Sequence, residues 1–311
     1  MNGANPTRVR SVFVIGATGF VGGGVARHLV GEGRRVSGLA RSDVAAASLG
    51  RSGVIPVRGD LDAGFADVLR HARTTDAVLL VAQLDDDLEA RTVAALLDAL
   101  RGTGATFVFT SGSGVMLERT EGAWSDASFA EGDDFPVEPL AARRREIERA
   151  ILDAASSRLR TMVIRPGMIW GAGDHSHVTM TYRSVSVTGA ACYVGEGLNT
   201  YANVHLDDVA RLFSTALDRG RPGALYHAVA GETPTRWIAE AVARDLGVPS
   251  RSLSAQEASA VWGEFGALIL GSSSRLRAPR SRDELGWMPR RTDMLTSVGD
   301  ARLRRLAGVA A

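Results

Sequence analysis

A glycine-rich turn near the start of the chain has the residue spacing that can hold a diphosphate. Residues 16–22 read GATGFVG, follow a β-branched apolar run and lead into a helical pattern that begins at Val21. Gly16 permits a tight turn, Gly19 a close approach of the backbone to a pyrophosphate, and Gly22 close packing of helix on strand. Free N–H groups and the helix dipole add attraction for phosphate. The sequence therefore predicts a dinucleotide site containing Gly16, Thr18, Gly19, Phe20, Val21 and Gly22.

The residue that follows the second predicted strand, residues 35–40, indicates which dinucleotide the site prefers. An NAD site usually has an acidic residue near this point for the ribose 2′-hydroxyl. Here Arg41 follows the strand, with Ser42 beside it. A guanidinium can pair with a 2′-phosphate through two hydrogen bonds, so we predict that NADP(H) is preferred over NAD(H). The alternative is that Arg41 is solvated and the pocket does not discriminate.

Residues at the ends of two further predicted strands are expected to line the adenosine part of the same pocket. Asp60 follows the third strand and could bond the adenine amino group, while Leu61 could pack on the ring. Ala82 and Gln83 end the fourth strand close to the same place. Each of these segments, taken alone, is equally compatible with an ordinary loop.

Two serines follow the fifth predicted strand, residues 106–111, and could act on a substrate. Ser111 and Ser113 could donate hydrogen bonds near a nicotinamide. A nicotinamide coenzyme supplies the hydride itself, so the protein must orient the substrate and stabilise the alkoxide that forms. A substrate hydroxyl beside the ketone could supply the proton instead, and this would leave no trace in the sequence.

Histidines in the second half of the chain are further candidates. His175 and His177 follow the sixth predicted strand, and a histidine titrates near neutral pH. Tyr201 and His205 are four residues apart and could face one pocket. A surface or structural role is the favoured interpretation of each histidine. No cysteine cluster accompanies them, so we expect no metal site.

Apolar runs of strand length alternate with helical patterns in the first half of the chain. Candidate strands cover residues 11–16, 35–40, 54–57, 77–82, 106–111 and 161–165, and helices are expected at 88–101 and 139–157. Strands that are apolar throughout indicate a parallel sheet covered on both faces. The expected fold is α/β, a Rossmann-type doubly wound parallel sheet over residues 8–170. Residues 171–311 are expected to form a smaller substrate-binding lid, with later segments returning to the first domain.

Composition narrows the possible functions. The 311 residues carry a net charge of +1, from 35 acidic residues and 36 basic residues that are all arginine. This balance gives no electrostatic case for nucleic acid or an anionic membrane as partner. The single cysteine excludes an internal disulfide, and no apolar run reaches the length of about 18 residues that spans a bilayer. We expect a cytoplasmic protein whose mechanism uses no lysine.

Several segments resemble motifs of the extended and atypical short-chain dehydrogenase/reductases, also called NAD-dependent epimerase/dehydratases. They read GATGFVG at 16–22, GDL at 59–61, TSGSGV at 110–115, IRPGMIWG at 164–171, VHLDDVA at 204–210 and LGWMP at 285–289. The resemblance covers nearly the whole chain. It implies that the segment 164–171 lies beside the nicotinamide, where coenzyme contacts are expected from Arg165, Pro166, Gly167 and Ile169.

The resemblance fails at the catalytic residues. The family uses a Ser or Thr after the fifth strand and a Tyr-x-x-x-Lys motif on the next helix. Alignment of that helix places Leu140 at the tyrosine position and Arg144 at the lysine position. Arg144 could orient the ribose as the lysine would, although its pKa makes it a poor proton donor. The chain thus resembles atypical members, some of which are ketoreductases of antibiotic pathways, while others bind the nucleotide without turnover.

These observations favour an NADPH-dependent ketoreductase. Its partner would be a small-molecule carbonyl substrate, bulky and mostly uncharged, such as a secondary metabolite, and the enzyme would act as a monomer or homodimer. One alternative is a non-catalytic sensor of the NADP/NADPH ratio, which the missing tyrosine and lysine favour. Another is a nucleotide-sugar epimerase or dehydratase, against which the loss of the proton-transferring tyrosine argues.

Overall fold

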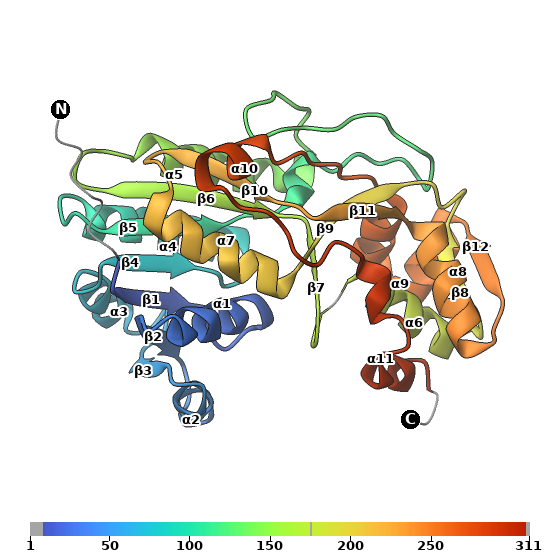
Figure 1. Ribbon diagram of the computed structural model, residues 1–311, viewed down its shortest axis with the longest axis horizontal. Coiled ribbons are helices and arrows are strands. Elements are labelled where there is room, and N and C mark those ends of the chain that lie inside the picture. The colour runs from blue at the N-terminus through green and yellow to red at the C-terminus, as the bar shows by residue number, and fades with distance from the viewer. Residues whose placement is uncertain (1–8, 175, 309–311) are drawn as a thin grey trace.

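A seven-stranded parallel sheet forms the centre of the larger part of the molecule (Figure 1). The computed structural model describes residues 9–174 and 176–308. The strand order β10-β6-β5-β4-β1-β2-β3 reverses direction beside β1, which creates the crevice where open α/β sheets bind ligands. The predicted doubly wound parallel sheet is confirmed. Its strands are β1 (Ser11–Ile15), β2 (Arg35–Ala40), β3 (Ile55–Arg58), β4 (Ala77–Leu80), β5 (Thr106–Thr110), β6 (Arg160–Pro166) and β10 (Ala224–Ala228).

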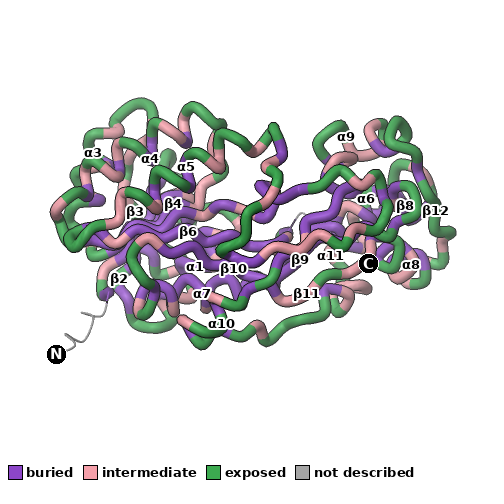
Figure 2. The backbone as a smooth tube through the Cα atoms, turned by 90° about the horizontal axis from the view of Figure 1, so that it is seen from above, coloured by how far each residue is buried: buried purple, intermediate pink, exposed green. Residues whose placement is uncertain are grey.

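Helices cover both faces of this sheet. Figure 2 shows them above and below the buried strands. The first face carries α1 (Phe20–Gly31), α2 (Asp43–Arg51), α7 (Leu206–Arg219) and α10 (Pro279–Leu285). The second face carries α3 (Phe65–Ala72), α4 (Asp86–Leu100) and α5 (Ala142–Asp153). Since α7, β10 and α10 follow residue 170, the chain returns to the main sheet after it has entered the smaller part.

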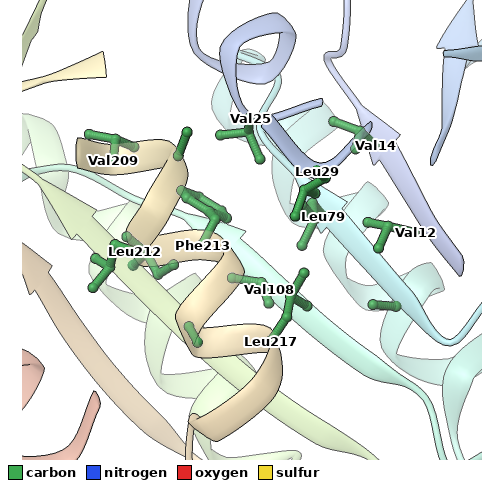
Figure 3. Close-up of a cluster of buried hydrophobic side chains, with 14 of the residues drawn as sticks. Val12, Val14, Val25, Leu29, Leu79, Val108, Val209, Leu212, Phe213 and Leu217 are labelled. Carbon is green, nitrogen blue, oxygen red and sulfur yellow. The ribbon is translucent and has the colours of Figure 1, made fainter. Parts of the chain in front are cut away.

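The core on the first face is made by α1 and α7 packed side by side on the sheet. Figure 3 shows Val25 and Leu29 of α1 meeting Phe213 of α7 above Val14 and Leu79 of the strands. All five side chains are fully buried. Apolar residues at helical spacing supply one buried stripe on each helix. This packing holds the start of α1 against the end of β1, where the glycine turn lies.

The smaller part of the molecule lies beyond the carboxyl ends of the strands. A three-stranded sheet in the order β11-β9-β7 leads into it, and a short parallel pair joins β12 to β8. Its strands are β7 (Met168–Trp170), β8 (Ala191–Val194), β9 (Thr200–His205), β11 (Gly231–Pro234) and β12 (Ser250–Leu253). Its helices are α6 (His177–Thr188), α8 (Thr235–Leu246), α9 (Ala255–Gly271) and α11 (Ala301–Leu306). Single 3-10 turns cover Ser113–Met116, Pro139–Ala141 and Met294–Ser297.

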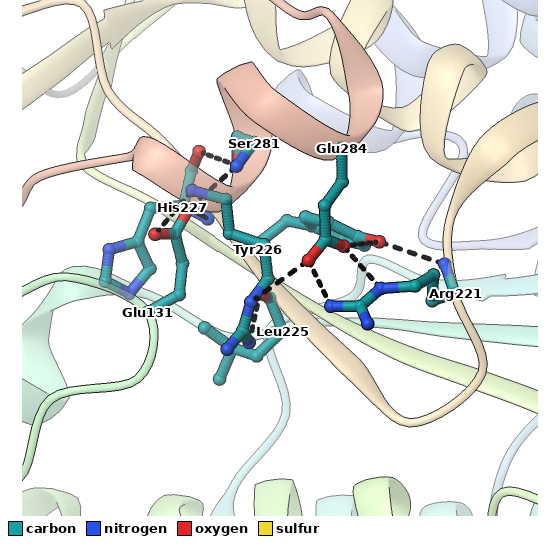
Figure 4. Close-up of polar contacts among 8 residues, drawn as sticks. Glu131, Arg221, Leu225, Tyr226, His227, Ser281 and Glu284 are labelled. Atoms are coloured by element: carbon teal, nitrogen blue, oxygen red, sulfur yellow. Dashed lines mark hydrogen bonds and ion pairs between the residues drawn. The ribbon is translucent and has the colours of Figure 1, made fainter.

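Polar contacts fasten α10 to the edge strand β10 (Figure 4). The Glu131 carboxylate accepts a hydrogen bond from the Ser281 backbone N–H at 3.0 Å. The Ser281 hydroxyl donates to the His227 carbonyl at 2.7 Å, and Glu131 lies 3.1 Å from the same hydroxyl. At the other end of α10, Arg221 Nε donates to Glu284 at 2.8 Å. These bonds tie a late segment of the chain to the main sheet.

One expectation about local structure was wrong in part. The helix expected at residues 139–157 is shorter: a 3-10 turn at Pro139–Ala141 precedes α5, which ends at Asp153. Residues 171–197, for which the sequence predicts no particular element, contain α6 and β8. Among the described residues, no helix is long and apolar enough to cross a membrane.

Candidate active site

One cavity of about 1030 Å³ opens at the carboxyl ends of the parallel strands and extends to the smaller part of the molecule. Most residues predicted to bind coenzyme or substrate lie in its lining, although the sequence places them far apart. Their binding roles stay predictions. These residues are Gly16, Thr18, Gly19, Phe20, Val21, Gly22, Arg41, Ser42, Asp60, Leu61, Ala82, Gln83, Ser111, Ser113, Pro166, Gly167 and Ile169.

The glycine turn has no room for side chains at two of its three glycines. Gly16 has a φ of 101°, and a Cβ there would lie 2.6 Å from the backbone nitrogen of Ala82. A Cβ on Gly22 would lie 2.2 Å from the Gly16 carbonyl oxygen. Gly19 differs, because its Cβ would meet only that same oxygen, at 3.3 Å. The first and third glycines thus allow the turn to form, while the second leaves the helix start open to the cavity.

The start of α1 suits an anion. Gly19 is its N-cap, no side chain caps the helix, and no acidic residue lies in its first turn. The first N–H groups of a helix have no partner within it, so they are available to oxygen atoms of a ligand. Deeper in the cavity, the Ser111 hydroxyl is buried without a hydrogen-bond partner among the described residues. An open helix start and an unpaired hydroxyl in one cavity fit a dinucleotide diphosphate with its nicotinamide end near Ser111.

The adenosine end of the cavity contains one arginine and a structured acidic turn. Arg41 follows β2 and is exposed. Asp60 accepts the backbone N–H groups of Asp62 at 2.8 Å and Ala63 at 3.3 Å. The bond from Asp62 and, more weakly, the Arg41 charge lower the pKa of Asp60. One oxygen of Asp60 therefore stabilises the turn at residues 60–63. The Ser42 hydroxyl caps α2 by accepting from the Ala45 N–H at 3.2 Å.

Arg165 does not belong to the described lining of the cavity, against the expectation from its motif. Alternate side chains of a strand point to opposite faces, and Arg165 points from β6 toward α5. There its Nε donates to Glu148 at 2.7 Å, a second N–H donates to the other Glu148 oxygen, and the guanidinium lies 5.2 Å from the Phe135 ring. The neighbouring Pro166 and Gly167 do line the cavity.

Arg144 also lies away from the described lining, so its expected contact with the ribose is not supported. Its guanidinium donates to Glu89 of α4 at 2.7 Å and lies 5.8 Å from the Phe109 ring. Glu89 is fully buried, and Arg144 is the cation beside it. A buried carboxylate needs such a partner, which explains where this arginine points.

Glu89 should make stability depend on pH. Burial raises its pKa from 4.5 to about 7, although Arg144 opposes the shift. The folded protein then holds this proton more tightly than the unfolded chain, so the free energy of unfolding falls as pH rises from about 4.5 to about 7. Glu89→Gln should remove a component on the order of 2–3 kcal/mol over that range. Denaturant unfolding of the wild type and the variant at about pH 5 and pH 8 measures this component. If the stability of both proteins changes equally between these two pH values, the prediction is wrong. The exposed Glu146→Gln variant serves as the control.

Of the candidate histidines that the structure describes, neither His177 nor His205 lines the cavity. His175 lies outside the described residues. His177 is buried, and burial lowers its pKa to about 4, so it is neutral at pH 7. His205 caps α7 by accepting the Asp207 N–H at 3.1 Å and packs edge-on against Trp170 at 4.5 Å. Of the pair Tyr201 and His205, only Tyr201 lines the cavity.

The outer half of the cavity is mostly apolar and comes from the smaller part of the molecule. Its wall on α9 is bent, because Gly263 interrupts the helix with a φ of 73°. The sequence motifs do not identify this wall, apart from Tyr201, which the sequence offers as a candidate. The α6 residues were missed because this helix is rich in Ser, Thr and Val, although Ser176 as N-cap and Gly189 after its end mark its limits. The wall consists of Met180, Arg183, Tyr201, Trp262, Phe265, Gly266 and Ile269.

The sequence pattern of the NAD dependent epimerase/dehydratase family matches residues 12–229, which hold the glycine turn, the whole parallel sheet and the β9 strand of the cavity. The chain belongs to this family. Membership supports an enzyme of the oxidoreductase or dehydratase type.

Several known proteins are similar to this family member over most of its length. The uncharacterized protein C2A9.02 of Schizosaccharomyces pombe is 31% identical, over 92% of this chain and 97% of its own. The 2-alkyl-3-oxoalkanoate reductase of Stenotrophomonas maltophilia is 30% identical, over 68% of this chain and 67% of its own. The crystal structure of dTDP-glucose 4,6-dehydratase from Bacillus anthracis in complex with NAD has a TM-score of 0.73 at 16% identity, and covers 96% of this chain and 95% of its own.

Proposed function

We propose that this family member reduces a carbonyl group with NADPH. The observation that carries the proposal is the continuity of one cavity. It joins the open start of α1, the Arg41 guanidinium, the buried Ser111 hydroxyl and an apolar outer half. A coenzyme bound along the helix start, Arg41 and Ser111 would have its nicotinamide end facing the apolar outer half, where a substrate can enter.

The outer half suits a bulky, largely apolar substrate. Trp262, Phe265 and Ile269 of α9 line this part of the cavity together with Met180 of α6, whose carbonyl accepts from Trp262 Nε1 at 3.0 Å. Phe265 remains 69% exposed, although a large aromatic side chain gains free energy when it is covered. A bulky substrate would cover it. Among relatives, the name 2-alkyl-3-oxoalkanoate reductase describes a carbonyl compound with alkyl groups, which agrees with this class.

A nucleotide sugar fits the described lining less well. The only cationic side chains in it are Arg41, at the adenosine end, and Arg183 in the outer half. A nucleotide-sugar diphosphate would have Arg183 alone to neutralise its two phosphates. Phosphate recognition usually relies on several charge-assisted hydrogen bonds. The charge distribution therefore favours the carbonyl substrate over the family's sugar substrates.

Each group of residues in the cavity would have its own role in the reaction. A reduced nicotinamide coenzyme, when bound, supplies a hydride to the carbonyl carbon. The N–H groups at the start of α1 would hold the diphosphate, and Arg41 would hold the 2′-phosphate. Ser111 and Ser113 would donate hydrogen bonds to the carbonyl oxygen and so stabilise the negative charge that develops on it. The apolar wall would exclude water and orient the substrate.

Oxidation of NADPH, followed by absorbance at about 340 nm, tests the proposal against a panel of ketones and 2-alkyl-3-oxo acids. We expect turnover of at least one bulky apolar member and none of small polar ketones such as acetone. Tight binding of NADPH without turnover of any compound would contradict the proposal and support the sensor. Conversion of UDP-glucose or dTDP-glucose would support the sugar chemistry instead.

Arg41→Ala should lower the preference for NADPH. The variant loses the charge-assisted hydrogen bonds proposed for the 2′-phosphate, so the ratio of NADPH to NADH affinity should fall by about tenfold or more. Fluorescence titration with both coenzymes measures the ratio. Arg58→Ala is the matched control, because Arg58 ends the adjacent strand, pairs with Asp43 at 3.3 Å and is not part of the described lining. An unchanged ratio in Arg41→Ala would remove the proposed role.

A further inference from the structure

A buried phenol lies in the cavity beside the two serines that follow β5. Tyr201 is 4% exposed and lines the cavity. Its hydroxyl lies next to Gly114, since a Cβ built on that glycine would be 3.6 Å from the hydroxyl oxygen. Gly114 and Ser113 line the cavity as well. The hydroxyl therefore reaches the region between the end of β5 and the outer half, although Tyr201 belongs to β9, in another sheet.

We propose that Tyr201 is the proton donor of the carbonyl reduction, in place of a tyrosine on the helix after β5. This inference rests on the proposed function. The α5 helix and the turn before it contain no tyrosine, and the side chain at the aligned position, Leu140, is 67% exposed. A phenol would thus reach the cavity from β9 instead of from the helix after β5.

Contacts on several sides hold the Tyr201 ring and hydroxyl in place. Its strand lies between β7 and β11, and Tyr201 itself bridges to Ser274. The His177 ring packs at 5.3 Å from its ring. The Ser274 hydroxyl, on the residue to which Tyr201 bridges, donates to the Ser113 carbonyl at 2.8 Å and so fixes the segment beside the phenol. A donor held in this way needs little reorganisation when a substrate binds.

The electrostatic surroundings keep this phenol protonated until a stronger base, such as an alkoxide, lies beside it. Burial raises the pKa of Tyr201, so the phenol is neutral at pH 7. The Ser113 and Ser274 side chains act in the opposite direction, because they favour the phenolate. His177, the nearest titratable ring, is neutral at this pH. Tyr201 can therefore donate a proton to the alkoxide that forms on the substrate.

The step balances with the reductant named above. As the carbonyl carbon gains a hydride, the π electrons of the C=O bond move to the oxygen. The O–H bond of Tyr201 breaks, and its proton forms the new O–H bond of the alcohol. The phenolate then recovers a proton from water that enters through the open mouth of the cavity. The carbonyl compound is reduced by two electrons and the coenzyme is oxidised by two.

Tyr201→Phe tests the inference with a carbonyl substrate that the wild type reduces. We expect kcat to fall by about 10²–10⁴-fold, while NADPH affinity, measured by fluorescence in the absence of substrate, stays within about twofold. Tyr193→Phe is the matched control, since Tyr193 lies on β8 against Arg236 and is not part of the described lining. It should retain wild-type activity.

The reverse reaction gives a second readout. Alcohol oxidation by the wild type needs the phenolate, so its rate should rise about tenfold per pH unit below the pKa of Tyr201. The Tyr201→Phe variant should lose this dependence. If the variant keeps both a kcat within about threefold of the wild type and the same pH dependence, Tyr201 is not the donor, but the proposed function stands. If the wild type reduces no carbonyl compound, both proposals fall.

Discussion

A Gly19→Val variant is expected to lose coenzyme affinity by at least about 100-fold, or roughly 2.7 kcal/mol, while it remains folded. Gly19 has ordinary backbone angles, with φ −82° and ψ 174°, so valine can adopt its conformation. A Cβ there approaches only the Gly16 carbonyl oxygen, at 3.3 Å. The two methyl groups would instead occupy the space in front of the helix N–H groups, where the diphosphate is proposed to bind.

Isothermal titration with NADPH measures the affinity, and thermal unfolding shows whether the variant is folded. Gly22→Val is the matched comparison, because its Cβ would lie 2.2 Å from the Gly16 carbonyl oxygen. That variant should lose stability as well as binding. If Gly19→Val binds NADPH as tightly as the wild type, the diphosphate does not lie at the start of α1, and the assignment of the cavity as a coenzyme site fails.

Arg165→Met is expected to lower the free energy of unfolding by about 3–5 kcal/mol. Arg165 is 1% exposed, and its partner Glu148 is fully buried. Removal of the guanidinium leaves the Glu148 carboxylate in the core with Arg145, at 3.1 Å, as its remaining ion-pair partner. A buried charge that loses a hydrogen-bonded partner costs far more than an exposed one.

Denaturant unfolding measures this loss, with Arg143→Met as control. Arg143 lies on the same helix as Glu148 and pairs with Glu146 at 2.9 Å on the surface, where removal of a pair costs about 0–1 kcal/mol. A loss below about 1 kcal/mol for Arg165→Met would mean that the buried pair contributes little. Coenzyme affinity of the folded Arg165→Met protein should be close to that of the wild type, because Arg165 is absent from the described lining.

The parallel sheet, and the fact that the proposed coenzyme contacts line one cavity, could be predicted because their signals are local. Strands that are apolar throughout indicate burial on both faces, and in a parallel sheet the residues after each strand meet at one edge. Arg41, Asp60, Gln83 and Ser111 all follow strands, so their common location needed no knowledge of the rest of the chain.

The remaining residues depend on contacts that sequence spacing does not show. Arg165 and Arg144 occupy motif positions, but each turns toward a buried carboxylate on a neighbouring helix. Nothing in the local sequence reveals that Glu148 and Glu89 are buried and need these cations. Tyr201 could be named as a candidate, but its hydroxyl lies beside Gly114, 87 positions earlier, and only the folded chain brings the two residues together.

The two halves of the cavity come from separate stretches of the chain. Residues up to 114 and the segment 166–169 line the half where the coenzyme is proposed to bind, whereas the apolar wall lies on α6 and α9, with Tyr201 between them. Substitutions on those two helices can alter which compounds are accepted while the proposed nucleotide contacts stay unchanged. A lineage could therefore diversify its substrates by drift in two short helices, which is how one ancestral scaffold can come to serve many metabolites.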